Sequence, residues 1–280
     1  MLSRRAADRL FTAAVILLAA AAVAPLAHIL YTVTARGLPV VVDAGLSFFT
    51  STPAPPGSSE VGGIAPALVG SLWLGLLSSA IALPVAFMLG AFLYEFRGSR
   101  VAGPIRALTM SLLEIPTILV GMLVYSVVVV AIGGFSLAAG AIALAIIMTP
   151  YVAVYVERAL DSVPRSYREA GLALGMSRAR VLFTVVAGIA RRGILAGFLI
   201  GVAKALGETA PLLFTIGSSR SSPALTPLEP GDAAPLLIFQ FIASPYSNWQ
   251  DLAWGASFIL TLSVLLLFVA TRVVVREVRI

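Results

Sequence analysis

Residues 193–211 read GILAGFLIGVAKALGETAP, an apolar segment that carries one lysine and ends in Gly-Glu-Thr-Ala-Pro. Lys204 and Glu208 are four residues apart, so on a helix they share one face and can form an ion pair. A charged residue near the centre of a bilayer costs about 2.5–3.5 kcal/mol on insertion scales, and such residues usually face a cavity or a partner. The segment predicts a membrane helix in which Lys204 and Glu208 line a pathway. The alternative is that their ion pair only orders the helix bundle.

Proline and glycine shape the two ends of this segment. Pro211 removes the N–H that would bond to the carbonyl of Gly207, so we expect a kink or an exposed carbonyl beside the two charges, with the Thr209 hydroxyl nearby. Upstream, small residues recur every four positions and create a groove on one helix face, which predicts close packing against another helix rather than a ligand site. These residues are Gly193, Gly197 and Gly201.

The composition of the whole chain agrees with a membrane protein. Of its 280 residues, 59% are hydrophobic and 11% are charged, whereas a soluble domain carries about 25% charged residues. Each of six apolar stretches is long enough for a tilted transmembrane helix. They are Leu10–Val33, Ala67–Tyr94, Ala107–Ile132, Phe135–Val156, Gly193–Ile216 and Leu252–Val275. The breaks between them are Thr50–Gly63, Phe96–Arg106, Gly133–Gly134, Glu157–Arg192 and Ser218–Asp251.

The basic residues predict the orientation. Of the 19 basic residues, all but Arg36, Arg220 and Lys204 fall on one side of the six spans, including Arg4, Arg5 and Arg9 before the first span and Arg272, Arg276 and Arg279 at the end. The positive-inside rule therefore places both termini in the cytoplasm. Basicity here predicts orientation in a lipid bilayer and no nucleic-acid partner. The first apolar run is longer than the core of a signal peptide, which favours an uncleaved anchor.

Several kinds of chemistry are excluded. The chain has no cysteine and one histidine, so we expect no thiolate or histidine-rich metal site. Its single lysine, Lys204, lies between two alanines, which rules out a Walker motif. No nucleophile and base pair is evident, so we expect a chain without catalytic residues and without a cofactor of its own.

The segment 157–192 combines seven arginines and three acidic residues with an apolar set. A fully solvated loop would not need that apolar set. Short helices broken at Pro164 and Gly175, with an apolar face on a partner, explain it better. The alternative is a loop that lies on anionic lipid headgroups.

A motif in this segment resembles a known family. Glu169-Ala170-Gly171-x-x-x-Gly175 is similar to the E-A-A-x-x-x-G loop of binding-protein-dependent ABC importer permeases, where a short coupling helix docks on the ATPase subunit. The resemblance implies that Arg168, Glu169, Ala170, Gly171, Leu174 and Gly175 couple the chain to an ATPase. The family pattern continues into I-x-L-P, and this chain departs from it with Val185-Val186-Ala187-Gly188.

The stretch Gly207–Leu213 resembles the signature of the PstA family, the permease subunits of phosphate-specific ABC importers. Further segments agree between Gly62 and Arg272: Gly62–Gly70, Tyr94–Phe96, Pro116–Gly121, Val163–Pro164, Arg168–Ala170 and Ile238–Trp254. Two residues depart from the family pattern. Lys204 stands where arginine is expected, and a lysine is a compact point charge without the planar fork of arginine. Glu114 stands where a small residue is usual, and it could pair with Lys204, pair with an arginine of a second permease, or lie in water.

The resemblance implies an all-α membrane protein with six transmembrane helices of the type I ABC importer architecture. Residues 1–65 would form an anchor helix and an external loop, and residues 66–280 the permease core with the coupling loop 157–192. The implied partners are a homologous PstC-like permease, two PstB-like ATPases that bind ATP and Mg²⁺, and an external PstS-like phosphate-binding protein. The implied pathway residues are Lys204, Glu208, Thr209, Pro211, Glu114 and Thr117.

Two other functions stay open at this stage. The chain could be the permease for another oxyanion, such as molybdate, tungstate or sulfate. It could also be a secondary transporter or a channel, which would usually show broken helices at corresponding places of two repeats. The sequence shows one such interruption, at Gly207–Pro211, and no second interruption that matches it.

Overall fold

The computed structural model describes residues 4–276, without the side chains of residues 4–7, 9 and 274–276. These residues are almost entirely helical and contain no strand beyond isolated backbone bridges, which confirms the predicted all-α class. The longer helices are α1 (Arg4–Ala44), α3 (Ala65–Glu95), α4 (Ala102–Glu114), α7 (Leu137–Asp161), α10 (Ala187–Leu206) and α12 (Ser247–Arg276). The shorter ones are α2 (Ser47–Thr50), α5 (Thr117–Val124), η1 (Tyr125–Val129), α6 (Val130–Ile132), α8 (Arg165–Ala173), α9 (Arg178–Arg180), η2 (Val181–Val186), η3 (Leu212–Phe214) and α11 (Ala234–Ile242).

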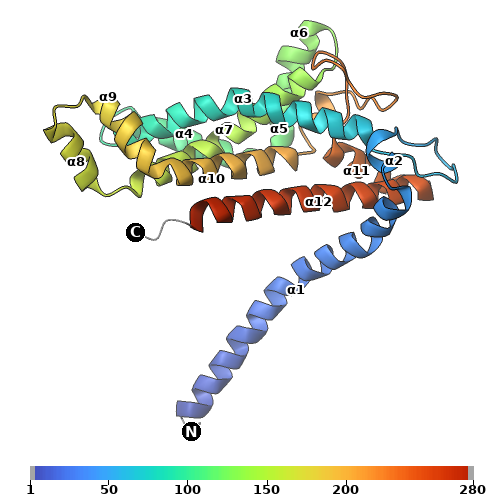
Figure 1. Cartoon of the computed structure of the whole chain (residues 1–280), viewed down its shortest axis with the longest axis horizontal. Helices are drawn as coiled ribbons and strands as arrows, with labels where there is room; N and C mark the ends of the chain where they lie inside the picture. The colour runs from blue at the N-terminus through green and yellow to red at the C-terminus, as the bar shows by residue number, and fades with distance from the viewer. Residues whose placement is uncertain (1–3, 277–280) are drawn as a thin grey trace.

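The core of the bundle is α7, which packs against α3 on one side and α10 on another (Figure 1). Its buried side chains include Leu144, Met148, Val152 and Leu160. The helix α12 runs beside α10 (Figure 1). The carboxyl-terminal part of α1 contacts α12, whereas the amino-terminal part of α1 points away from the bundle (Figure 1). Burial of apolar surface inside the chain is therefore concentrated on α7 and its immediate neighbours.

Four predicted spans are confirmed as single helices that are longer than predicted. The spans Leu10–Val33, Ala67–Tyr94, Phe135–Val156 and Leu252–Val275 correspond to α1, α3, α7 and α12. Five helices are long and apolar enough to cross a membrane, and up to six if the bent pair formed by α4 and the segment Thr117–Ile132 is one span. The Gly133–Gly134 break is also confirmed, since Gly133 ends α6 with a φ of 75°.

The prediction of one continuous helix over Ala107–Ile132 is wrong. The helix α4 ends at Glu114, and the chain resumes as α5 at Thr117 after a bend of 98°. Pro116 has no N–H to donate to the preceding turn, and its ring disfavours the helical conformation for Ile115, which is extended with a ψ of 128°. This span is therefore broken in the middle.

The predicted span Gly193–Ile216 is wrong at both ends. A continuous helix begins at Arg178 and ends at Leu206, so much of the segment predicted as a polar loop is helical. Long arginine side chains can leave the apolar surface and reach water at a helix end, so Arg191 and Arg192 do not interrupt the helix. At the other end the helix stops at Leu206, with Gly207 as the capping residue. The segment therefore ends there and does not continue through a kink to Ile216.

The predicted loop Ser218–Asp251 is also shorter than expected. It contains α11, and α12 already begins at Ser247. Pro235 lies in the first turn of α11, where backbone N–H groups have no partner within the helix. The missing N–H of proline therefore costs no hydrogen bond there, and its fixed φ fits the helix. Pro235 therefore starts a helix inside the segment predicted as a loop.

The predicted close packing of the glycine face is confirmed. A Cβ atom at Gly193 would lie 2.9 Å from Ala159 Cβ, and one at Gly197 would lie 2.6 Å from Tyr155 Cβ. At Gly201 an added Cβ would overlap Val152 Cγ2. All three partners belong to α7, so the backbones of α10 and α7 approach one another along three turns.

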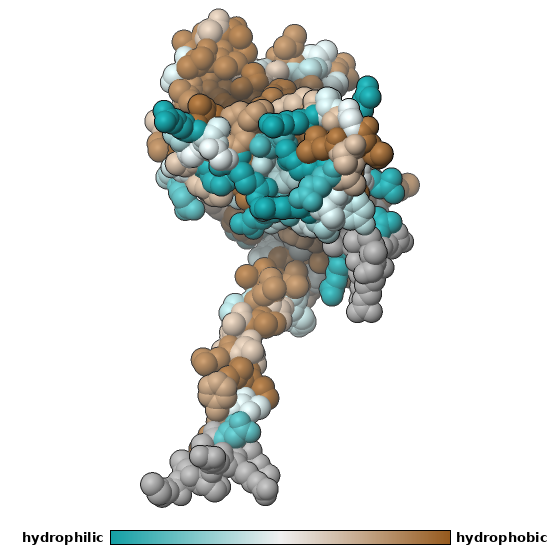
Figure 2. All heavy atoms as spheres, turned by 90° about the vertical axis from the view of Figure 1, so that its left-hand side faces the viewer, coloured by the Kyte–Doolittle hydropathy of each residue, from teal (hydrophilic) through white to brown (hydrophobic). Residues whose placement is uncertain are grey.

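The end of the bundle that carries α8 and α9 is hydrophilic, whereas its flanks and α1 are largely hydrophobic (Figure 2). Exposed arginines at this end include Arg100, Arg165, Arg178 and Arg180. This is the end that the positive-inside rule assigns to the cytoplasm. Arg279 and the side chains of Arg4, Arg5, Arg9 and Arg276 lie outside the described residues.

A single methyl group on the glycine face tests the α10–α7 contact. We expect Gly197→Ala to lower stability by about 1–3 kcal/mol, because its Cβ has no room beside Tyr155 and overpacking strains both helices. The matched control is Gly188→Ala in the same helix, where an added Cβ meets no atom within 4 Å. Thermal unfolding of the detergent-solubilised protein measures both, and equal melting temperatures for the two variants would contradict the close contact.

Candidate functional site

The predicted charge pair forms at the end of α10. Lys204 lies in the last turn of the helix, Glu208 lies in the turn that follows, and Lys204 Nζ contacts Glu208 Oε1. A cation in this position also interacts favourably with the negative end of the helix dipole. Lys204 Nζ lies 5.5 Å from the centre of the Tyr151 ring on α7. Glu208 is buried and Lys204 is partly exposed, so the lysine is the more accessible of the two charges.

The turn after α10 is held by its own backbone. The N–H of Leu212 donates to the Thr209 carbonyl at 3.1 Å, and the buried Thr215 hydroxyl donates to the Pro211 carbonyl at 3.0 Å. Pro211 is the residue before η3, where its fixed φ suits the start of a helical turn. The sequence Gly-Glu-Thr-Ala-Pro therefore forms a defined turn between two helical segments.

The second half of the broken span packs on this turn. A Cβ atom at Gly121 on α5 would lie 2.6 Å from Pro211 Cα, so the backbones are in close contact. Thr117 is the first residue of α5, one helical turn before Gly121. The break at Pro116 is a second interruption that was not predicted, and it leads into the helix that packs on Pro211.

Glu114 does not join this site through an ion pair. It is the last residue of α4, it is exposed, and within residues 4–276 it forms no salt bridge. Lys204 pairs with Glu208 instead. Of the three options for Glu114, a contact with a second permease and exposure to water remain predictions.

One predicted short helix of the segment 157–192 is confirmed as α8, whereas the residues from Arg178 onward belong to the long helix that ends at Leu206. Pro164 precedes α8, and Gly175 ends the turn after it with a φ of 79° that glycine adopts without strain. The residues predicted to couple the chain to an ATPase divide between two sides of α8. Gly171 is buried and Arg168 is partly buried, whereas Glu169, Ala170 and Leu174 are exposed. The exposed group is therefore the part of the motif that can meet a partner.

A polar cluster that the sequence did not predict lies between η3 and α11. Arg220 Nε donates to Asp232 Oδ2 at 2.7 Å, the same guanidinium contacts Gln240 Oε1, and its carbon Cζ lies 4.7 Å from the centre of the Phe241 ring. Asp232 is fully buried, and its Oδ1 has no hydrogen-bond partner among the described residues. Arg220 stood out in the sequence as an isolated external arginine, but nothing marked Asp232 as its partner.

Burial raises the pKa of Asp232 above its ordinary value of 3.8, although the charge and hydrogen bond of Arg220 oppose that rise. Removing a carboxylate from water disfavours its charged form. The backbone around Asp232 is also tightly packed, since a Cβ at Gly70 of α3 would overlap the Asp232 carbonyl oxygen. The cluster therefore fixes the external loop onto α3.

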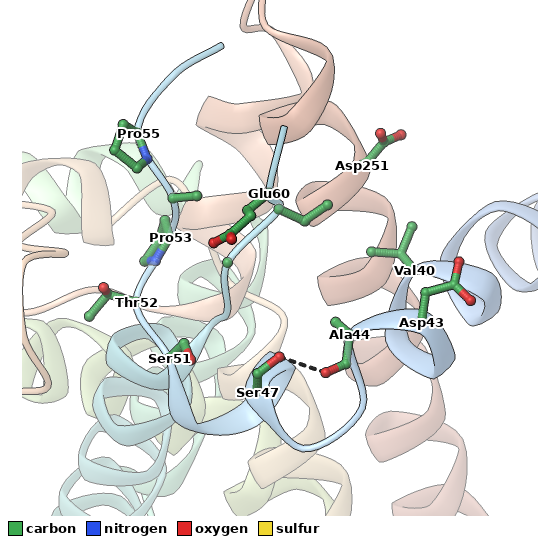
Figure 3. A pocket seen from close by; sticks show the side chains of 13 residues that line it. Val40, Asp43, Ala44, Ser47, Ser51, Thr52, Pro53, Pro55, Glu60 and Asp251 are labelled. Carbon is green, nitrogen blue, oxygen red and sulfur yellow. Dashed lines mark hydrogen bonds between the residues drawn. The ribbon is translucent and has the colours of Figure 1, made fainter. Parts of the chain in front are cut away.

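A hollow of about 720 Å³ lies at the outer end of α1 and α12 (Figure 3). Asp43, Glu60 and Asp251 are placed around it by α1, the loop after α2 and α12, and the Ser47 hydroxyl donates to the Ala44 carbonyl at 2.6 Å beside it (Figure 3). Three carboxylates disfavour an anion here. The turn with Lys204 is the better candidate for anion contact.

Comparison with known proteins identifies the chain. A family described as "Binding-protein-dependent transport system inner membrane component" matches residues 82–279. The chain belongs to this family. Its relatives include the probable phosphate transport system permease protein PstA of Methanocaldococcus jannaschii, 45% identical over 96% of this chain and 94% of that protein. The phosphate transport system permease protein PstA of Haemophilus influenzae is 40% identical over 88% of this chain and 86% of that protein.

Solved structures support the fold of this inner membrane component. A chain of the MetNI methionine ABC transporter in an inward-facing conformation superposes with a TM-score of 0.64 at 19% identity, covering 76% of this chain and 95% of that chain. A second crystal form of the same transporter gives a TM-score of 0.58. The predicted architecture of an ABC importer permease is therefore confirmed.

The buried aspartate gives the permease a pH-dependent stability. The pKa of Asp232 is raised in the folded state, so the folded protein holds the proton of this carboxyl more tightly than the unfolded chain does. The resulting contribution to the free energy of unfolding is fully present below the ordinary pKa of 3.8 and is lost as the pH rises through the folded pKa. We expect the wild type to lose melting temperature relative to Asp232→Asn as the pH rises above that value. Thermal unfolding of both proteins in detergent across pH 4 to 8 measures the difference. A gap in melting temperature that is constant or moves in the opposite direction would contradict the assignment.

Proposed function

We propose that the chain is the permease subunit of an ATP-driven importer of inorganic phosphate and forms part of its translocation pathway. The observation that carries this function is the 45% identity over 96% of the chain to a permease named for phosphate transport. A likeness of this extent covers the coupling segment and the turn after α10 together. The chain itself is non-catalytic, and ATP hydrolysis belongs to its partners.

The complex we propose contains a second, homologous permease, two cytoplasmic ATPases that bind ATP and Mg²⁺, and an external phosphate-binding protein. These partners correspond to the PstC-like, PstB-like and PstS-like subunits implied by the family. The exposed residues at the end of α8 support the contact with an ATPase, because Leu174, which directly follows this helix, leaves 83% of its surface uncovered at the end that faces the cytoplasm. No nucleic acid takes part.

In this proposal Lys204 is the cation of the pathway. A positive group offsets the hydration that phosphate loses on entering the membrane, and a lysine ammonium does so as a point charge with three donors. Glu208 partly neutralises it, so the anion is held weakly enough to leave. The position of the pair, at the end of α10 beside the turn on which the broken span packs, supports a role in transport rather than in bundle order alone.

The pathway role is tested by phosphate uptake of the reconstituted complex. We expect Lys204→Gln to lower kcat/KM for phosphate by about tenfold or more, in line with the ~1.5–3 kcal/mol of a hydrogen bond to a charged group. Lys204→Arg should keep uptake. Uptake of sulfate and molybdate in the same assay identifies the anion. A complex that takes up one of these anions and no phosphate would show that phosphate is not the substrate.

A double variant separates transport from bundle order. Lys204→Gln alone leaves the buried Glu208 carboxylate unpaired, which destabilises the turn by itself. In Lys204→Gln with Glu208→Gln neither charge remains, and we expect a complex that assembles but still takes up phosphate poorly. Restored uptake in the double variant would assign the ion pair to bundle order and reject the pathway role.

The docking surface on α8 is tested by a charge at its most exposed leucine. We expect Leu174→Glu to reduce binding of the ATPase by about tenfold or more, since a buried leucine contributes about 1.5–3 kcal/mol. The matched control is Leu225→Glu on the external loop, because Leu225 is also 83% exposed. Co-purification of the tagged ATPase measures both, and equal recovery with the two variants would count against docking through Leu174.

A further inference from the structure

The cytoplasmic end of α3 is enclosed by three arginines. Arg106 Nη2 donates to the Leu93 carbonyl at 3.3 Å, and Arg97 Nε donates to the Tyr94 carbonyl at 3.3 Å. The last carbonyls of a helix have no partner within it, so these arginines satisfy them. The third arginine, Arg168, comes from α8 and meets the side chain of Glu95, the final residue of α3.

A carboxylate at this position is unfavourable by itself. The carboxyl-terminal end of a helix carries a partial negative charge, and Glu95 adds a full one there. Its side chain is only 9% exposed, so water compensates little. Glu95 therefore depends on a cation from another part of the chain.

Arg168 supplies that cation in a geometry that fixes orientation. Its Nη1 donates to Glu95 Oε2 at 2.7 Å and its Nη2 donates to Glu95 Oε1 at 2.5 Å. Two parallel charge-assisted hydrogen bonds define the angle between the planar groups as well as their distance. The hydrogen bonds that Arg168 donates to Glu95 raise the pKa of Arg168. By contrast, Arg97 and Asp161 form a single exposed contact at 2.6 Å, the kind of pair that contributes little.

The helix α8 has a second attachment on its apolar side. A Cβ atom at Gly171 would lie 2.9 Å from Val181 Cγ2, so α8 packs closely on η2, which continues directly into α10. The helix α3 in turn packs on α7, where a Cβ at Gly90 would lie 2.6 Å from the Ala153 carbonyl oxygen. Thus α8 bridges two helices, α10 through an apolar contact and α3 through one bidentate ion pair.

We propose that the Glu95–Arg168 pair is the positioning link through which a movement of α8 reaches α3, so that α3 and α10 move together when the ATPases close; this rests on the proposed function. Arg168 therefore faces the membrane helices and not the ATPase, unlike the exposed members of its motif. Without the pair, α8 keeps its Gly171 contact with η2 but loses its charged attachment to the end of α3. The complex then hydrolyses ATP without moving both helices.

The link is tested with Glu95→Gln in the complete complex with its ATPases and binding protein in liposomes. We expect the ATPase to co-purify in the wild-type amount, and the phosphate taken up per ATP hydrolysed to fall about fivefold or more, the lower range of measured couplings between sites. Arg168→Lys keeps the charge without the fork and should also lower the ratio. A wild-type ratio in either variant would overturn the proposal.

The neighbouring ion pair provides the matched control. Arg97→Gln removes an arginine at the same end of α3 whose hydrogen bonds go to the Tyr94 carbonyl and to Asp161. The Glu95–Arg168 pair stays intact in this variant, so we expect its ratio of phosphate to ATP to stay at the wild-type value. A loss as large as that of Glu95→Gln would assign the effect to the helix end in general and overturn the specific link.

A readout that needs no substrate separates this proposal from the proposed function. The chain contains no cysteine, so spin labels at Leu76→Cys on α3 and Ser166→Cys on α8 report one distance. We expect the change in this distance between the nucleotide-free and ATP-bound complexes to differ in Glu95→Gln from that of the wild type. Identical changes would overturn the link, whereas a wild-type complex that takes up no phosphate would overturn the proposed function alone.

Discussion

The close contact between α10 and α7 fixes the positions of both ends of α10. Gly193, Gly197 and Gly201 carry no side chain, and each faces a residue of α7. In a bilayer, where lipid is as apolar as leucine, such backbone approach replaces the hydrophobic effect as the force that holds helices together. Because α10 is held along its length, its cytoplasmic end places η2 beside α8 and its other end places the Lys204 turn beside α5. The coupling segment and the candidate anion site are thus carried by one rigid element.

Local patterns were sufficient to predict part of this arrangement. The i,i+4 spacing of Lys204 and Glu208, the glycine repeat and the break at Gly175 all depend on residues within a few positions of each other. The prolines were harder to interpret. Pro211 follows the end of one span and Pro116 interrupts another. Because Pro116 lies within a long apolar run, that run was predicted as one continuous helix and the break was missed. Pro235 has the same chemistry and starts α11 instead, because the effect of proline depends on whether its N–H would have been needed.

Contacts between distant segments could not be predicted in the same way. Arg168 and Glu95 are 73 positions apart, and Asp232 and Arg220 come together only after the external loop folds over α3. Sixteen of the basic residues together predicted the orientation of the chain in the membrane. Their distribution did not indicate which of them form ion pairs inside the fold. The motif that begins directly after Arg168 resembles the family pattern, but it could not separate the residues of α8 that turn inward from those that turn outward. That division requires the position of α3.

The helix α1 has a different relation to the bundle. Its most apolar window has none of its residues buried, and its close contact with the rest of the chain is at Gly37, where an added Cβ would lie 2.6 Å from Phe258 Cβ on α12. Most of the helix therefore adds length in the membrane without adding to the intramolecular core. Lipid can solvate that surface, so the rest of the fold does not depend on where α1 points. Residues 10–31 of α1, which are all exposed, can accordingly diverge in sequence, so long as they stay apolar, without disturbing α7, α10 or the sites that they carry.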